Sequence, residues 1–290
     1  MKTVLKVLTF FTAFTLIGCS SESLYKKIET AEVDMLNEES LMRYNTNRLE
    51  TVGNEKNDFI SKALYACHQQ KLIKGKGILE QEMHANKVNP FYWNALGTCY
   101  LLSNELTKSQ FFYDLGIESL PKLKAQDKDL AEATLTNNIG LIHLKHRRYK
   151  EAFDLFSKSR SLLPNFFTPQ FNIAQLFMEF NENDKALEVL LKLQEKNPND
   201  IDLLYSLSLI YFRKNDFDKS FSSITRIKKN YLNRPDIVGL YAFNLMKKNR
   251  LSEAKEIIEK RIYADEFDNR NKMLLEEINQ KIKERTAHEN

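Results

Sequence analysis

Apolar and small residues recur along this chain with a period of 34 positions. Within each period, apolar residues lie three and four positions apart in two separate stretches, which predicts two amphipathic helices joined by a short turn. A small residue returns in the second stretch at Gly75, Ser109, Ala152, Ala186, Ser220 and Ala254, and every interval but one is 34 residues. Such a helix pair cannot bury its apolar face alone, so we expect neighbouring pairs to stack into an all-α solenoid.

The remaining positions of each unit follow the same register. If the small residue is position 20, the six units begin at Lys56, Pro90, Ala133, Phe167, Ile201 and Pro235. Unit two shows the scheme most fully, with Trp93, Leu96, Gly97, Tyr100 and Tyr113 at positions 4, 7, 8, 11 and 24. Small residues at positions 8 and 20 let the two helices approach closely, and large residues at 4, 11 and 24 fill the space between them.

This pattern resembles the tetratricopeptide repeat. Units three and four carry it at Asn138, Ile139, Gly140, Tyr149, Ala152, Phe156, Ile173, Ala174, Phe177, Ala186 and Leu190, and units two to four have a proline at position 32, namely Pro121, Pro164 and Pro198. Units five and six lack that proline, and unit one, with Phe59, Ala63, Ala66, Gly75 and Leu79, is degenerate. The resemblance implies a right-handed solenoid of about six helix pairs over residues 56–264. We expect the turn between the two helices of a unit near Asn104, Arg147, Asn181, Asn215 and Asn249.

One interval breaks the period. From Ser109 to Ala152 it is 43 residues, which places nine extra residues around Lys122 to Glu132. This stretch is charged and contains no glycine, so it either lengthens the loop between units two and three or extends a helix there. An insertion of this kind often lies on a binding face of a solenoid, and it is as often inert.

The amino terminus has the pattern of a secretory signal. Lys2 and Lys6 flank a short apolar run from Val7 to Ile17 that is too short to span a bilayer comfortably. The run ends in Leu16-Ile17-Gly18-Cys19, which resembles the bacterial lipobox. That resemblance implies a signal peptide over residues 1–18 and lipidation, with palmitate among the acyl chains, at Cys19. The alternative is a plain cleaved signal or a signal anchor with a coincidental cysteine.

The residue after Cys19 is Ser20 and not an aspartate. By similarity to Gram-negative lipoproteins, this predicts release to the outer membrane, with the body on the periplasmic face. Several acyl chains, at about 0.8 kcal/mol for each buried methylene, would hold the protein at the membrane surface durably.

Two segments flank the solenoid. Residues 19–55 form a polar tether in which the stretch around Ile28 to Leu49 has enough spaced apolar residues for an accessory helix. Residues 265–290 are predicted to form a capping helix and tail. Its amphipathic part runs from Asp265 to Arg285 and would supply the polar outer cap that a solenoid needs. The apolar positions on which these two helices depend are Ile28, Val33, Leu36 and Leu41 in the first and Met273, Leu274 and Ile278 in the second.

Composition agrees with a helical body and does not indicate nucleic-acid binding. The formal net charge of +4 falls to +2 when Lys2 and Lys6 leave with the signal, and glycine and proline together number only 14 of 290 residues. Besides Cys19 there are two cysteines, Cys67 and Cys99. An oxidising periplasm permits a bridge between them, yet positions 12 and 10 of adjacent units do not obviously face each other. The pair is either a disulfide or two buried thiols.

No catalytic or cofactor-binding constellation emerges, so we expect no enzyme, no metal and no small-molecule substrate. His143 and His146 are three apart but have no cysteine or carboxylate at metal-ligand spacing. His143 also occupies position 11, where the repeat needs a packing ring, which favours a core role. The basic run around the turn of unit three is either a solvated turn or a contact for an acidic partner. It consists of Lys145, His146, Arg147, Arg148 and Lys150.

In tetratricopeptide-repeat proteins, positions 2, 5, 9, 12 and 13 of the first helices line a concave groove. Here they give Leu64, Phe91, Asn94, Leu101, Asn137, Leu141, Leu144, Phe171, Gln175, Met178, Tyr205, Leu209, Phe212, Phe243 and Met246. This apolar lining predicts a protein partner, bound as an amphipathic helix or an extended segment. The alternative is that an accessory or capping helix covers several of these residues. The paired lysine and asparagine that clamp a terminal carboxylate in related chaperone-binding proteins are missing.

A lipid anchor followed by six such units resembles, in architecture, the outer-membrane pilot lipoproteins of type IV pilus and tight-adherence systems. That resemblance implies a scaffold that assists assembly of a pilus or secretion complex, in which the groove holds a segment of a secretin subunit. The alternative is an adaptor lipoprotein that docks peptidoglycan enzymes or outer-membrane barrel assembly factors. A regulator of an enzyme or an unknown hydrolase is the weakest hypothesis, because no site supports it.

Overall fold

A computed structural model describes residues 59–68, 71–232, 234, 237–264 and 269–289. These residues form fourteen α-helices, α4 to α17, with two short 3-10 turns and no strand. The predicted all-α solenoid of helix pairs is therefore confirmed for this part of the chain. The signal peptide, Cys19, the tether and the accessory segment around residues 28–49 lie outside the described residues.

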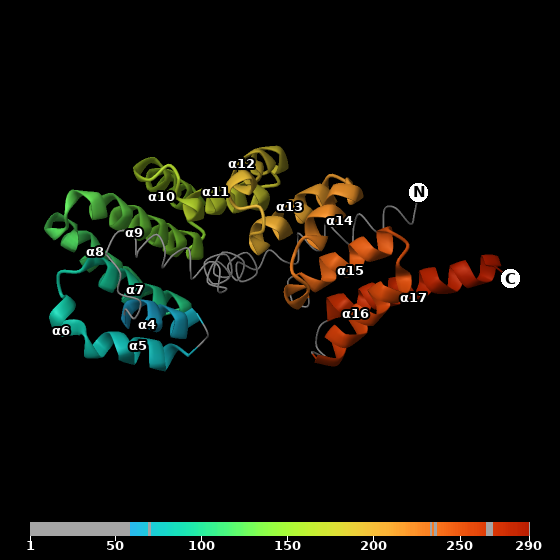
Figure 1. Ribbon diagram of the computed structural model, residues 1–290, viewed down its shortest axis with the longest axis horizontal. Helices are drawn as coiled ribbons and strands as arrows, with labels where there is room; N and C mark the ends of the chain where they lie inside the picture. Colours follow the sequence, from blue (N-terminus) through green and yellow to red (C-terminus); the bar gives the residue numbers. More distant parts are fainter. Residues whose placement is uncertain (1–58, 69–70, 233, 235–236, 265–268, 290) are drawn as a thin grey trace. The chain divides into compact units, whose positions relative to one another are not determined.

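The chain divides into two compact units, residues 1–182 and residues 183–290. These two are written with digits below, as unit 1 and unit 2, whereas the 34-residue repeats keep their numbers in words, from unit one to unit six. In unit 1 (Figure 1), α7 lies alongside α4 and α8, and α9 lies alongside α10. The helices of unit 1 are α4 (Phe59–His68), α5 (Leu72–Gln81), α6 (Met83–Asn86), α7 (Pro90–Leu102), α8 (Leu106–Ser119), α9 (Ala125–Lys145), α10 (Tyr149–Leu162) and α11 (Phe167–Glu179). Helices α4, α7, α9 and α11 are first helices of repeats, and α5, α8 and α10 are second helices.

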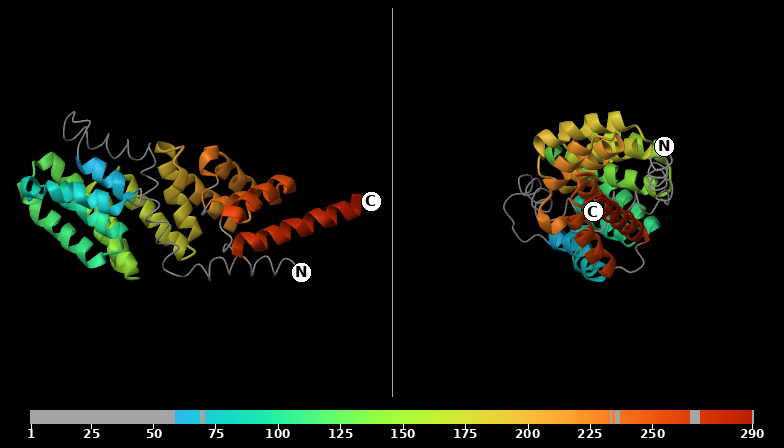
Figure 2. Two further views of the ribbon diagram at one scale, coloured as in Figure 1. Left: turned by 90° about the horizontal axis from the view of Figure 1, so that it is seen from below. Right: turned by 90° about the vertical axis from the view of Figure 1, so that its right-hand side faces the viewer.

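Unit 2 continues the alternation and ends in a long helix. Its helices are α12 (Asn183–Lys196), α13 (Ile201–Arg213), α14 (Phe217–Thr225), α15 (Val238–Lys247), α16 (Leu251–Ala264) and α17 (Asn269–Glu289). Figure 2 shows α17 as one continuous helix, and it packs against α16 and α15. Leu274 and Ile278 are buried in that contact, whereas Met273 is half exposed. The predicted capping stripe therefore consists of Leu274 and Ile278.

Local caps explain why two of the first helices, α7 and α13, begin where the register predicts. Helices α7, α11 and α13 each start at position 1 of their repeat. The Asn89 side chain accepts hydrogen bonds from the backbone N–H groups of Phe91 and Tyr92, and Pro90 occupies the first helical position. Asp200 likewise accepts from Leu203 N–H. Such side-chain caps satisfy N–H groups that have no partner within the helix.

The nine-residue insertion extends a helix. Helix α9 begins at Ala125, eight residues before the position where the repeat predicts a start, and runs for 21 residues. Ala131, within the insertion, is 1% exposed and belongs to the unit 1 core. The stretch has no glycine, so nothing in it favours a break, and its apolar residues reach the neighbouring core. The insertion is therefore structural along at least one face.

All five residues predicted at the turns adopt the left-handed conformation, with φ between 57° and 61°. At the first turn, Asn104 N–H donates to Leu101 O and Glu105 N–H donates to Tyr100 O. The other four turns, at Arg147, Asn181, Asn215 and Asn249, repeat this pair of bonds. This is the Schellman motif, which ends a helix by satisfying its last carbonyl groups. Asparagine tolerates the left-handed region better than most residues, and Arg147 is the one turn residue without that advantage.

The small residues at positions 8 and 20 are buried at the contact between the two helices of a repeat. In unit 1, a Cβ on Gly97 would lie 2.5 Å from the Tyr113 ring, and a Cβ on Gly140 would lie 2.7 Å from the Phe156 ring. In unit 2, the hydroxyls of Ser208 and Ser220 each donate to the other residue's backbone carbonyl at 2.9 Å. The predicted close approach is thus present, with a ring over glycine in one unit and a serine pair in the other.

Cys67 and Cys99 form a disulfide that joins α4 to α7, with their Cα atoms 5.4 Å apart. This answers the question that their repeat positions left open. Gly75 makes room for the bridge, because a Cβ there would lie 2.2 Å from Cys67 Sγ. The two cysteines are 32 residues apart, and closing a loop of that length stabilises a fold by about 3–4 kcal/mol in the chain-entropy account. The degenerate first repeat is therefore fastened covalently to the second.

The left-handed arginine generates a stability prediction. Replacing Arg147 by glycine removes the steric cost of a Cβ at positive φ, which we expect to raise the free energy of unfolding by about 0.5–1 kcal/mol. Urea denaturation followed by circular dichroism measures it. Arg148→Gly is the matched control, because Arg148 has φ of −84° and glycine there adds only entropy to the unfolded chain. Equal effects of the two substitutions would contradict the strain at Arg147.

Candidate partner-binding surface

The predicted groove residues divide between the two units. Those of unit 1 form what we call the unit 1 face: Leu64, Phe91, Asn94, Leu101, Asn137, Leu141, Leu144, Phe171, Gln175 and Met178. Those of unit 2 are Tyr205, Leu209, Phe212, Phe243 and Met246. All fifteen side chains are buried, and the most exposed, Phe91, is only 8% accessible. That they bind a partner stays a prediction, and their burial means that binding requires them to be uncovered.

In unit 2, two of the predicted residues pack against each other. The rings of Phe212 and Phe243 meet edge to face with centroids 4.8 Å apart, and Phe217 meets Phe212 at 5.5 Å. The Lys247 ammonium lies over both Phe217 and Phe243, at 5.0 and 5.2 Å from their ring centroids. Cation–π attraction of this kind orders an aromatic cluster. Burial lowers the pKa of Lys247, so the cluster accepts the cation at a cost in desolvation.

A ladder of amides connects three first helices of unit 1. Asn138 Nδ2 on α9 donates to Asn94 Oδ1 on α7 at 2.9 Å, and Asn137 Nδ2 donates to Asn138 Oδ1 at 3.0 Å. Asn172 Nδ2 on α11 donates to Asn137 Oδ1 at 2.9 Å, which leaves Asn172 Oδ1 buried without a hydrogen-bond partner. An unsatisfied buried acceptor costs about 1–3 kcal/mol. The ladder sets the register of adjacent repeats because each amide must meet its neighbour.

The basic run at the turn of unit three separates into two environments. His146, Arg147 and Arg148 are exposed, and Lys150 is paired with Asp154. Lys145 is instead half buried, and its Nζ donates to Leu101 O and Asn104 Oδ1, each at 3.3 Å. Burial lowers the pKa of Lys145 to about 7. Its Nζ lies at the carboxyl end of α7, where the helix dipole favours the positive charge that burial disfavours.

His143 lies in the packed position that the repeat predicts, half buried on α9. Burial, with a smaller contribution from Arg148, lowers its pKa, which favours the neutral ring. Among the residues the structure describes, no group of three histidine, cysteine or acidic side chains is placed to hold a metal ion.

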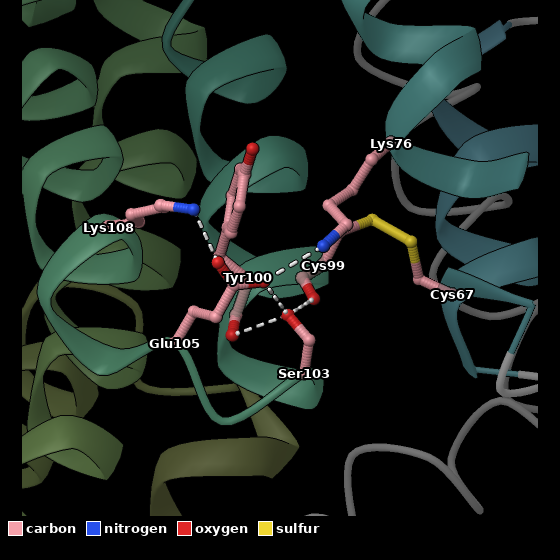
Figure 3. Close-up of polar contacts among 7 residues, drawn as sticks. All are labelled: Cys67, Lys76, Cys99, Tyr100, Ser103, Glu105 and Lys108. Atoms are coloured by element: carbon pink, nitrogen blue, oxygen red, sulfur yellow. Dashed lines mark hydrogen bonds and ion pairs between the residues drawn. A yellow bond between two sulfur atoms is a disulfide. The ribbon is translucent and has the colours of Figure 1, made fainter. Parts of the chain in front are cut away.

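Figure 3 shows a charged cluster beside the disulfide that sequence analysis did not find. Glu105 accepts from Lys76 at 2.9 Å, from Lys108 at 2.5 Å and from the Ser103 hydroxyl at 3.0 Å. These hydrogen bonds lower the pKa of Glu105 to about 2. Both ammonium groups also lie over the Tyr100 ring, at 4.6 and 5.2 Å from its centroid. Lys76 belongs to α5, so the cluster joins the first repeat to the turn of the second.

Three sets of side chains characterise the candidate surface. The described part of unit 1 brings together apolar side chains, a rigid amide ladder and turn-capping charges, and the sequence analysis placed the first of these sets. The amide ladder had a signal in the sequence, because asparagine recurs at positions 5 and 6 of units two to four, at Asn94, Asn137, Asn138 and Asn172. The Glu105 cluster had none, since Lys76, Ser103, Glu105 and Lys108 are separated by up to 32 residues and fall outside the repeat positions.

Comparison with known proteins agrees with the fold. Residues 143–219 match the tetratricopeptide repeat family. Among curated proteins, none shows significant sequence similarity. None of the described helices is both long enough and apolar enough to cross a membrane.

Three solved structures illustrate the likeness. Pseudomonas aeruginosa PilF is similar at a TM-score of 0.60 and 13% identity, over 76% of this chain and 96% of that one. A tetratricopeptide repeat protein from Parabacteroides merdae is similar at a TM-score of 0.51 and 13% identity, over 88% and 99%. The APC/C hetero-tetramer Cut9-Hcn1 gives a TM-score of 0.65 and 14% identity, over 91% of this chain but 50% of that chain. At these identities the likeness shows the fold, which is that of a tetratricopeptide-repeat solenoid.

Lys145 generates a pH prediction. Its pKa of about 7 in the folded chain lies below its ordinary value of 10.5, so the unfolded chain holds more protons between about pH 7 and 10.5. The free energy of unfolding therefore gains with rising pH over this window, and we expect the gain to be smaller in Lys145→Met. Urea midpoints at pH 7 and pH 9 measure it. Lys128→Met removes an exposed lysine and should keep the wild-type slope; identical slopes for all three proteins would refute the burial of this charge.

Proposed function

We propose that this protein is a membrane-anchored interaction scaffold, an outer-membrane lipoprotein that assists assembly of a pilus or secretion complex. The observation that carries the proposal is the unit 1 face. It combines seven apolar side chains with an amide ladder that holds adjacent first helices in register. A surface of this composition suits the apolar side of a helix or an extended segment of another protein. Apolar anchors supply the affinity, and the fixed repeats supply the shape.

The likeness to PilF from Pseudomonas aeruginosa favours this proposal over a general scaffold. The similar region takes in nearly all of that chain, 96%, so the two solenoids correspond in extent as well as in repeat type. The lipobox-like sequence before Cys19 and the disulfide support an exported location, because disulfides persist in oxidising compartments such as the bacterial periplasm. The expected partner is a secretin subunit.

The lipid anchor is tested by Cys19→Ser. Without the cysteine sulfur no acyl chain can be attached, so we expect the folded protein to leave the membrane fraction and become soluble in the periplasm. Fractionation followed by immunoblotting measures this, with Ser21→Ala, which keeps Cys19 and the disulfide, as the control. Membrane association of Cys19→Ser that survives alkaline washing would rule out the anchor.

The partner is tested by photocrosslinking in native membranes. A photoreactive phenylalanine replaces Phe91, the most accessible residue of the unit 1 face. The matched control replaces Phe111, which is 57% exposed on α8. We expect a secretin subunit to be crosslinked from position 91 and not from position 111, with identification by mass spectrometry. Capture of a peptidoglycan enzyme or a barrel assembly factor from position 91 would replace the pilus assignment with the adaptor role. Equal capture from both positions would exclude the face as the site.

A further inference from the structure

The second helix of the first repeat is poorly suited to fold by itself. Helix α5 has 10 residues, among them Gly75 and Gly77, and each glycine lowers the equilibrium constant for helix formation about fivefold relative to alanine. The side chain of Lys71, at the N-cap, makes no capping hydrogen bond, and the first turn has no acidic residue to complement the helix dipole. Because isolated helices shorter than about 12 residues are marginal in water, α5 depends on what it packs against.

Packing gives α5 less support than the other second helices of unit 1 receive. The structure describes all residues of α5, and Leu79 is the one buried side chain among them. Leu79 is at repeat position 24, where α8 and α10 bury the larger rings of Tyr113 and Phe156. The ion pair of Lys76 with Glu105 is partly exposed, so it adds little. The disulfide that joins α4 to α7 is therefore the strongest single link between the first repeat and the solenoid.

Helix α5 lies directly over this disulfide. A Cβ at Gly75 would lie 2.2 Å from Cys67 Sγ and 2.7 Å from Ala63 O, so the backbone of α5 covers the sulfur atom. Cys67 and Cys99, whose bridge is drawn in Figure 3, are both fully buried. An oxidant can therefore reach the two sulfur atoms only while α5 is away from α4. Oxidation has to precede the docking of α5.

We propose that the first repeat folds onto the solenoid only after Cys67 and Cys99 have been oxidised, and that this chain is a substrate of a dithiol oxidase. One thiolate attacks the disulfide of the oxidase, and the other thiolate then displaces the oxidase from the mixed disulfide. The two cysteines lose two electrons and two protons, which the oxidase disulfide takes up as it becomes a dithiol. The inference goes beyond the proposed function, because it concerns when the first repeat folds and not what binds to it.

The closed repeat also protects the bridge. Reduction requires a thiolate to attack one of the two sulfur atoms, and both are covered in the folded chain. The link therefore persists after folding without further contact with an oxidase. Oxidation acts as a one-way step in the assembly of the solenoid and not as a switch that follows the redox potential of the surroundings.

This step connects the folding of the chain to its export. In a reducing compartment the first repeat stays undocked, and in an oxidising compartment it closes. Helix α4 supplies Leu64 to the unit 1 face, so only the oxidised chain presents that face complete. The consequence for the face rests on the proposed function, whereas the folding step does not.

Hydrogen exchange of the purified full-length protein tests the inference. All chains carry Cys19→Ser, so that no third thiol interferes. The oxidised chain is compared with Cys67→Ala and Cys99→Ala combined, which cannot form the bridge. We expect amide protection in α4 and α5 to fall about tenfold or more in that variant, while protection in α10 and α16 is unchanged. The chain with both cysteines, refolded in a phosphine reductant, controls for the lost sulfur atoms and should match it.

Two outcomes of this comparison would overturn the inference. Equal protection of α5 with and without the bridge would show that the first repeat folds unaided. Loss of protection throughout both units would show that oxidation governs the whole chain and not the first repeat.

Two further substitutions separate the disulfide from other supports of α5. An added Cβ at Gly77 meets nothing within 4 Å, so Gly77→Ala in the reduced chain should raise the protection of α5 about fivefold. Glu105→Gln removes the ion pair with Lys76 and should lower the protection of oxidised α5 by less than about fivefold. A loss as large as that caused by reduction would assign the link to the ion pair instead.

The order of oxidation and docking is tested by reduction of the folded chain. In dithiothreitol without denaturant, the bridge should survive about tenfold longer or more than in urea, because reduction has to wait for α5 to open. Maleimide labelling of Cys67 and Cys99 measures the rate. Equal rates would show that α5 does not shield the sulfur atoms. No partner is present in these measurements, so their outcome is independent of whether a secretin subunit is captured in membranes.

Discussion

The close approach of two helices within each repeat is the constraint on which the rest of this structure depends. It requires a small residue at position 8 and another at position 20, because a large side chain at either position would separate the helices. The volume removed there is returned at position 24. Where position 8 is a glycine, such as Gly97, position 24 is an aromatic residue, such as Tyr113, whose ring fills the space. Where position 8 is the larger Ser208, position 24 is the smaller Ile224. Because the two positions compensate, the repeat keeps its shape while its composition changes.

The register, the helix pairs and the five turns could be predicted from the sequence because each depends on residues 34 positions apart that obey one rule. The features that escaped prediction depend on contacts between repeats. The disulfide was undecided because positions 12 and 10 meet only where Gly75 lets α5 lie against Cys67. The extension of α9 was undecided because a charged stretch without glycine is compatible with a loop or a helix, and burial of Ala131 decides between them.

The predicted groove residues were placed on the correct helices, but exposure could not be predicted from repeat positions alone. Whether a residue at position 2 or 9 faces solvent depends on what else the chain folds against it, and that information lies outside the repeat. The polar residues beneath the face show the same dependence. Asn138 was assigned from its repeat position, whereas its role in bridging Asn94 and Asn137 follows from the stacking of α7 against α9.

The two ends of the described solenoid are secured by different chemistry. The carboxyl end is covered by α17 through side-chain packing, whereas the first repeat is bonded to the second through Cys67 and Cys99. In the proposed lipoprotein, the chain is tethered to the membrane through residues that precede α4. Any mechanical load between the membrane and a bound partner then enters the solenoid at α4. The disulfide carries that load from Cys67 directly to Cys99 in α7, so the pulling force bypasses the chain between the two cysteines, which includes α5. The second helix of the first repeat is thereby shielded from a force that enters through the first.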